Sequence, residues 1–119
     1  MTANKPNYVE IDKSALDLLA WNVSNEIVNG LELQNFEAKI GIPKLEFQSL
    51  YAALRGLPKG VNTNFHVEQA RIFSNALEVV MEELGVEEFA TRTGHPFAEG
   101  TTILQLLVGF VEMHEGGRI

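Results

Sequence analysis

The 119-residue chain is predicted to be all-α, a single-domain bundle of about five to six helices around a buried C-terminal helix at about residues 101–114. Two patterns predict this class. One stretch near the C-terminus is apolar around most of a helical circumference, and a glycine followed by an apolar residue recurs where helical patterns end. We expect one domain over residues 1–119, because a chain of this length buries roughly two thirds of its unfolded surface.

The C-terminal stretch carries more apolar surface per turn than any other part of the chain. A helix that is apolar nearly all round has to be enclosed by its own domain, by a second copy or by lipid. Lipid is disfavoured because a membrane span needs about 20 apolar residues. We therefore expect a core helix, built from Ile103, Leu104, Leu106, Leu107, Val108, Phe110, Val111 and Met113.

Helix ends are predicted from glycines, because glycine adopts the left-handed conformation that closes a helix and the next apolar residue packs back on the last turn. Pro96 cannot continue a helix and strengthens the last of these stops. The five predicted stops are Gly30, Gly41, Gly56, Gly85 and Gly94.

The remaining elements follow from alternation, capping and apolar spacing. Residues 1–7 are expected to be a flexible lead-in, 8–12 a short extended segment with Val9 and Ile11 on one side, and 115–119 a frayed tail. Ser14 is the expected N-cap of the first helix, whose buried face would hold Leu16, Leu19, Ala20, Val23 and Ile27. Further helices are predicted at 32–40, at 43–55 with Pro43 in the first turn, at 65–84 after an N-cap at Thr63 or Asn64, at 87–93, and at 101–114 capped by Thr101 or Thr102.

Charge and targeting signals limit the partners. Sixteen acidic against nine basic side chains give a net charge of -7, which repels phosphate backbones and favours a basic protein surface. Nucleic acid is therefore an unlikely partner. The polar first residues lack the apolar run of a signal peptide, so we expect a soluble protein of the bacterial cytoplasm with no membrane contact.

One alternative is a DNA-binding regulator. Residues 33–55 have the spacing of a helix-turn-helix around Gly41, and the second helix would present Lys44, Gln48 and Arg55 to DNA. Glu46 would face phosphate as well, so DNA binding stays an alternative to a plain helical hairpin.

Two features predict a protein interface. Asn22, Asn25, Glu26 and Asn29 form a polar stripe on the first helix beside Trp21, and tryptophan is common at binding hot spots. Gly109 lies in the middle of the C-terminal helix, where glycine costs about 1 kcal/mol relative to alanine. Its missing Cβ would let a helix of the same chain, or of a second copy, approach closely; both remain open, and a two-fold homodimer is expected.

Catalytic and metal-binding patterns are weak. The absence of cysteine excludes thiolate chemistry, and His66, His95 and His114 lack metal-ligand spacing. The acidic residues around Gly85 have different helical phases and predict a solvated patch: Glu78, Glu82, Glu83, Glu87 and Glu88. We expect no enzyme and no cofactor, although an open pocket lined by His95, Glu99, Thr101 and Thr102 would indicate one.

The sequence therefore predicts a non-catalytic, acidic interaction or regulatory module, expected to be homodimeric. The alternatives are the DNA-binding regulator and an acidic immunity- or antitoxin-type inhibitor of a basic protein.

Overall fold

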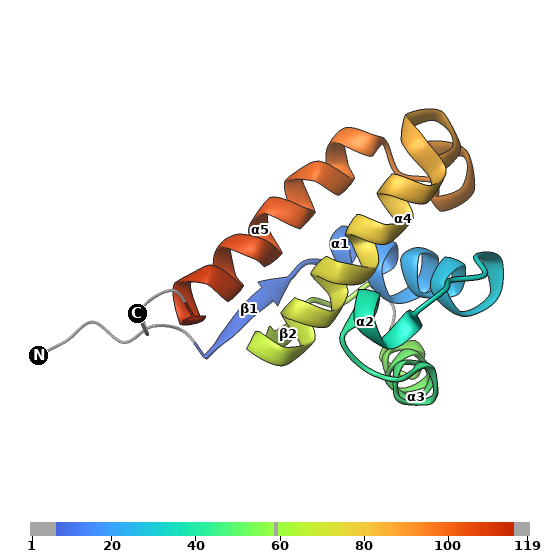
Figure 1. The fold of residues 1–119 in the computed structure, drawn as a ribbon. Coiled ribbons are helices and arrows are strands. Elements are labelled where there is room, and N and C mark those ends of the chain that lie inside the picture. The colour runs from blue at the N-terminus through green and yellow to red at the C-terminus, as the bar shows by residue number, and fades with distance from the viewer. Residues whose placement is uncertain (1–6, 59, 116–119) are drawn as a thin grey trace, which may run out of the picture.

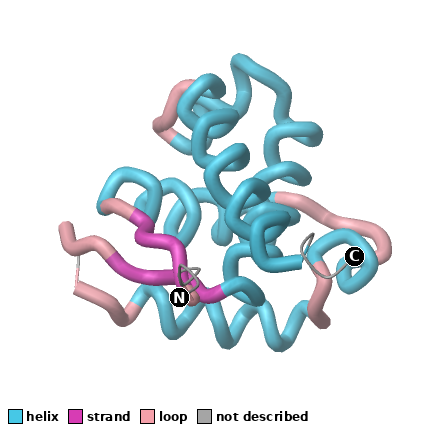
Figure 2. Tube along the Cα trace, turned by 90° about the vertical axis from the view of Figure 1, so that its left-hand side faces the viewer, coloured by secondary structure: helices cyan, strands magenta, loops and turns pink. Residues whose placement is uncertain are grey.

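The N-terminal extended segment forms a strand. A computed structural model describes residues 7–58 and 60–115, and in it β1 (Tyr8–Ile11) pairs antiparallel with β2 (Thr63–His66), so that Val9 lies opposite Phe65. The two strands lie together at one side of the molecule (Figure 2). The prediction that residues 63–65 start a helix is wrong. They belong to β2, in which only the side chain of Phe65 is buried, and His66 is the N-cap of the following helix.

The first helix has its N-cap two residues before the predicted Ser14 and is wider than an α-helix. Asp12 is the N-cap, since its Oδ1 accepts a hydrogen bond from the Ala15 amide at 2.9 Å. Helix α1 (Lys13–Leu16) continues into two π-helical segments, η1 (Asp17–Val23) and η2 (Glu26–Gly30). The Ser24 hydroxyl donates to the Leu19 carbonyl, five residues earlier, at 2.7 Å. All five residues predicted for the buried face are buried.

The next two helices are separated by Gly41, as predicted. Helix α2 (Phe36–Ile40) is shorter than the predicted 32–40, because Asn35 at its start takes a left-handed φ of 54°. Gly41, with φ of 108°, ends it. Pro43 is the N-cap of α3 (Lys44–Arg55) rather than its first helical residue, so this helix begins one residue later than predicted.

Helix α4 (Val67–Thr93) is the central element of the molecule. It contacts α5, η1, α2 and β2 and runs between α5 and α2 in Figure 1. Small buried residues, Ala70, Ser74 and Ala76, let these neighbours approach it. Gly85 (φ 75°, ψ 179°) interrupts α4, as its predicted helix stop requires, and Gly94 (φ 76°) ends it.

The C-terminal helix α5 (Phe97–Glu115) lies at the edge of the molecule, so the described residues of its own chain do not enclose it as predicted; enclosure by a second copy stays a prediction. It buries Ile103, Leu107 and Phe110 against the globule, whereas Leu106 and Met113 are each 46% exposed. The apolar composition of this stretch shows how much surface could be buried, but it does not show which side of the helix is covered. No described element of the chain covers the outer side of α5. Thr101 and Thr102 are not caps either, because their hydroxyls donate to carbonyls four residues earlier within α5.

Two of the predicted glycine stops do not use the left-handed conformation. Gly56 has φ of -78°, and Gly30 is not among the glycines with positive φ. The reason at Gly30 is a close approach: an added Cβ would collide with the Glu26 carboxylate and lie 2.9 Å from an Arg92 nitrogen.

Together the elements form a compact single globule, 75% helical, with five α-helices and one two-stranded sheet in the described residues. The predicted helical class and single globule are thus confirmed. Among residues 7–58 and 60–115, no helix has the length and hydropathy needed to cross a membrane. The predicted lead-in and tail fall, except for Asn7 and Glu115, outside the described residues.

Candidate functional site

The predicted polar stripe does not form one surface. Asn25 and Asn29 are exposed and bonded to each other at 2.9 Å. Asn22 is half-buried and donates to the backbone and side-chain oxygens of Asp17, both at 3.1 Å. The wide turns of η1 and η2 rotate the later residues away from the positions that a 3.6-residue period gives.

Glu26 is the clearest correction, because it is buried rather than part of an exposed interface. Only 6% of the residue is accessible, and its carboxylate oxygens lie 2.5 and 3.3 Å from two guanidinium nitrogens of Arg92. Burying a carboxylate is costly unless it is paired in this way. Glu26 therefore joins the first helix to the end of α4 and is not available to a partner.

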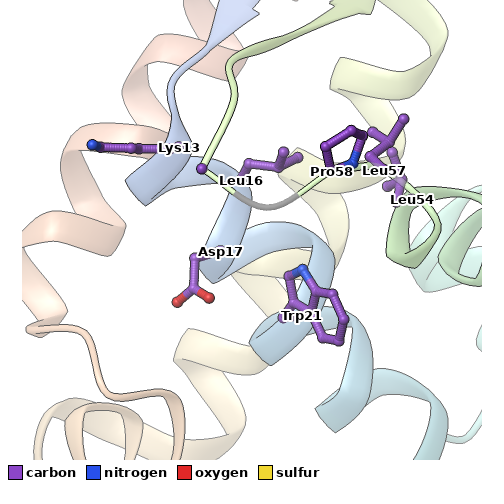
Figure 3. Close-up of a pocket in the computed structure, with 8 residues that line it drawn as sticks. Lys13, Leu16, Asp17, Trp21, Leu54, Leu57 and Pro58 are labelled. Atoms are coloured by element: carbon purple, nitrogen blue, oxygen red, sulfur yellow. The ribbon is translucent and has the colours of Figure 1, made fainter.

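Trp21 is half-buried beside a small pocket between α1 and the segment after α3. Figure 3 shows Asp17 and Trp21 on the first helix and Leu54, Leu57 and Pro58 across from them. The pocket has a volume of about 70 Å³, whereas ligand sites generally measure about 300–1,000 Å³. It is therefore too small for an organic ligand.

The residues predicted for DNA binding lie on α3, but they do not form one free basic face. Lys44 is exposed and Gln48 half-buried. The Arg55 guanidinium lies 4.9 Å from the Trp21 ring centroid and 5.2 Å from that of Tyr51. A cation stacked on two rings is held in place within the chain.

Gly109 is exposed, and no described helix of the chain crosses close to it. A Cβ added there would meet nothing within 4 Å. Of the two alternatives predicted for Gly109, the intrachain crossing is therefore wrong among the described residues. The glycine therefore costs helix stability, and no contact among residues 7–58 and 60–115 explains it.

We expect Gly109→Ala to raise the free energy of unfolding by about 0.5–1 kcal/mol, because alanine is the better helix former and the space is open. Urea denaturation measures this difference. Gly100→Ala on the same helix is the control: its Cβ would lie 2.9 Å from the buried Phe89 ring and should lower stability by about 1–3 kcal/mol. Equal effects at both positions would contradict the assignment of Gly109 to open space.

A groove lies between β1 and α5, next to Gly109. It consists of two adjacent hollows of about 460 and 510 Å³ that share Glu10 and Leu106. We call it the β1–α5 groove. Its apolar lining includes Tyr8, Val9, Leu106, Phe110 and Met113.

The charged lining of the β1–α5 groove is acidic. Among the described residues that line it, the charged ones are Glu10, Asp12 and Glu99. Asp12 is occupied as the cap of α1, and Glu10 is exposed on β1. The groove thus combines apolar and acidic lining residues.

One end of the groove is held by a network centred on His95. Gly94 ends α4, and the His95 amide bonds to the Thr93 hydroxyl at 3.2 Å. The buried imidazole then lies between two carboxylates: its Nε2 is 2.8 Å from Asp17 Oδ2, and its Nδ1 is 3.0 Å from Glu99 Oε2. The Ser14 hydroxyl donates to the same Glu99 oxygen at 2.8 Å.

This network has the geometry of a structural clamp. Both ring nitrogens face carboxylate oxygens, so both have to carry a proton to donate, and the imidazolium then has no lone pair for base catalysis. Ser14 contacts Glu99 rather than the histidine, so no activated hydroxyl results. An open pocket lined by His95, Glu99, Thr101 and Thr102 would have indicated an enzyme. Of these four residues, Glu99 and Thr102 line the groove and His95 and Thr101 do not.

Stability should depend on pH through His95. Burial alone would lower the pKa of His95, but the hydrogen bonds and charges of Asp17 and Glu99 outweigh it and raise this pKa above 6.5. The clamp's contribution is then complete below the unfolded-state value and is lost as pH rises through the folded-state value. We expect the melting temperature to fall as pH rises above about 6.5, and to fall less in His95→Gln. Parallel pH profiles of the two proteins would contradict this.

The acidic patch around Gly85 is exposed throughout, as predicted. In the described part of the chain, no group of three or more histidine, aspartate or glutamate side chains is placed to hold a metal ion. Sequence reasoning missed Tyr8, Glu10, Leu106 and Met113 as surface residues. The only local signal was Gly109, an unfavourable residue in the helix that forms one side of the groove.

No protein family matches this chain, and neither a curated protein nor a solved structure is significantly similar to it.

Proposed function

We propose that the chain is a non-catalytic protein-interaction module and that the β1–α5 groove is its binding surface. One observation carries this proposal: Tyr8, Leu106 and Met113, exposed by 52%, 46% and 46%, line the same groove. Single exposed apolar residues are common, whereas a shared apolar patch is typical of an interaction site.

The shape of the groove favours a segment of another protein. It follows α5 from Glu99 to Met113, about 21 Å at 1.5 Å per residue. Amphipathic helices bind in apolar grooves of this kind through side chains spaced three or four residues apart. A partner helix with apolar side chains at this spacing could place them along the apolar lining of the groove.

The homodimer remains a prediction, and charge argues against pairing through this groove. A two-fold contact about Gly109 would bring Glu10 of both copies into one interface, and like charges facing each other weaken association. We therefore place binding to a different protein first. An acidic inhibitor of a basic protein is one specific form of this proposal.

The DNA-binding alternative has less support. Helix α2 has only five residues, Glu46 is exposed beside Lys44, and Arg55 stacks on Trp21. Salt-sensitive retardation of duplex DNA that Lys44→Glu abolishes would favour it.

The test is site-specific photo-crosslinking in the cells that make the protein. A photoreactive amino acid replaces Leu106 in one variant and Leu45, which is 78% exposed on α3, in the control. We expect one defined protein to be linked at position 106 and not at 45. Its complex, reconstituted from purified proteins, should be lost in Leu106→Ser and kept in Leu45→Ser. If position 106 links to no protein and the purified chain sediments as a monomer, the proposal is wrong.

A further inference from the structure

We infer that the occupant of the β1–α5 groove is a basic, amphipathic helical segment of another protein, which crosses α5 at Gly109. This inference rests on the proposed function and adds the chemistry of the partner. Three features of the groove carry it: its charge, the exposed glycine and the length of its apolar lining.

The charge of the groove selects a cationic partner. The charged residues that line it among the described residues are all acidic; Asp12 and Glu99 are also bonded within the chain, whereas Glu10 is exposed on β1. The whole chain carries a net charge of -7. Lysine or arginine side chains on a partner would meet the carboxylates of the groove, and the net charge would accelerate their approach. A second copy of the chain would bring the same negative charge.

The exposed glycine marks the place of closest approach. Gly109 lies between Leu106 and Met113, both of which line the groove. Nothing lies within 4 Å of the position where its Cβ would be, so a partner helix can pack directly against the α5 backbone there. A larger side chain at this position would fill the groove without disturbing the chain's own packing.

The probe is a fluorescein-labelled helical peptide of about 16 residues, long enough to follow the groove. Leucines recur every three or four positions on one face, and lysines occupy the other positions. A matched peptide carries glutamate in place of lysine. Fluorescence anisotropy with the full chain should show binding of the basic peptide that weakens between about 50 and 200 mM salt, and at least about tenfold weaker binding of the acidic peptide.

Matched variants separate the groove from general charge attraction. Leu106→Ser and Gly109→Leu should each weaken peptide binding about tenfold, whereas Leu45→Ser should leave it unchanged. Glu10→Gln should weaken binding more than Glu37→Gln, which removes the same charge from an exposed position on α2. Circular dichroism and thermal melting establish that each variant is folded.

Two results would overturn this inference. The first is equal binding of the basic peptide to all variants, which would assign the attraction to net charge alone, and the second is no binding of the basic peptide to the natural chain. If position 106 nevertheless crosslinks to an acidic or uncharged protein, or to a second copy, the groove is still a binding surface and only the assigned partner chemistry fails.

Discussion

Replacing Phe73 with alanine is expected to lower the free energy of unfolding by about 3–5 kcal/mol. Phe73 is fully buried on the central helix α4. Its ring centroid lies 5.1 Å from that of Phe65 on β2 and 5.8 Å from that of Phe47 on α3. The substitution removes the contacts of Phe73 that join α4 to β2 and α3, and it leaves a cavity between the remaining rings.

The loss is large compared with the total stability of a domain, about 5–15 kcal/mol. A loss of this size unfolds a marginally stable domain at ordinary temperature, so Phe73→Leu provides a milder, measurable variant. Urea denaturation followed by circular dichroism gives the difference in free energy. Val86→Ala, at a 62% exposed position on α4, should change it by less than about 0.5 kcal/mol. A loss below about 1 kcal/mol for Phe73→Ala would contradict the central role of this cluster.

Replacing Arg92 with alanine is expected to cost about 3 kcal/mol, because it leaves the Glu26 carboxylate buried without its partner. The Glu26 side chain is 8% exposed, whereas that of Arg92 is 37% exposed. The asymmetry makes Arg92 the informative residue to remove, since the buried member of the pair then bears the desolvation penalty alone.

A double-mutant cycle isolates this pair. Glu26→Gln removes the buried charge, so Arg92→Ala should cost less in that background than in the natural chain. Glu68→Ala is the control: Glu68 pairs with Arg71, and its side chain is 63% exposed. It should change stability by less than about 1 kcal/mol. If the effects of Glu26→Gln and Arg92→Ala on the free energy of unfolding are additive, the pair does not couple the first helix to α4.

Local features of the fold could be predicted from the sequence because they depend on adjacent residues. Gly41 and Gly94 end helices where their positions predicted. The apolar spacing of the first helix identified its buried side chains, although π-helical turns widen it. These features depend on steric limits and periodicity, which a short window of sequence contains.

The long-range features could not be predicted in this way. Glu26 and Arg92 are separated by 66 residues, and Asp17 and His95 by 78. Neither pair has a local signal, because each forms only when the ends of separate helices meet. The wide turns also change the angular position of Glu26, which a regular helical projection places on the exposed side.

The candidate site was missed because composition cannot distinguish the core from an uncovered surface. Leu106 and Met113 belong to the same apolar stretch as the buried Leu107. Which of them is exposed depends on the place of α5 at the edge of the globule. The sequence therefore indicated the correct helix and the unusual glycine, but not the side of the helix that remains open.

Glu99 gives the groove and the His95 clamp a shared proton equilibrium. The same carboxylate oxygen accepts from Ser14, faces the imidazole and belongs to a residue that lines the groove. A cationic side chain that binds Glu99 from the groove would compete with the histidinium, and the histidine would release its proton more readily. Linkage is reciprocal, so such a ligand would be held more tightly in alkaline than in acidic solution.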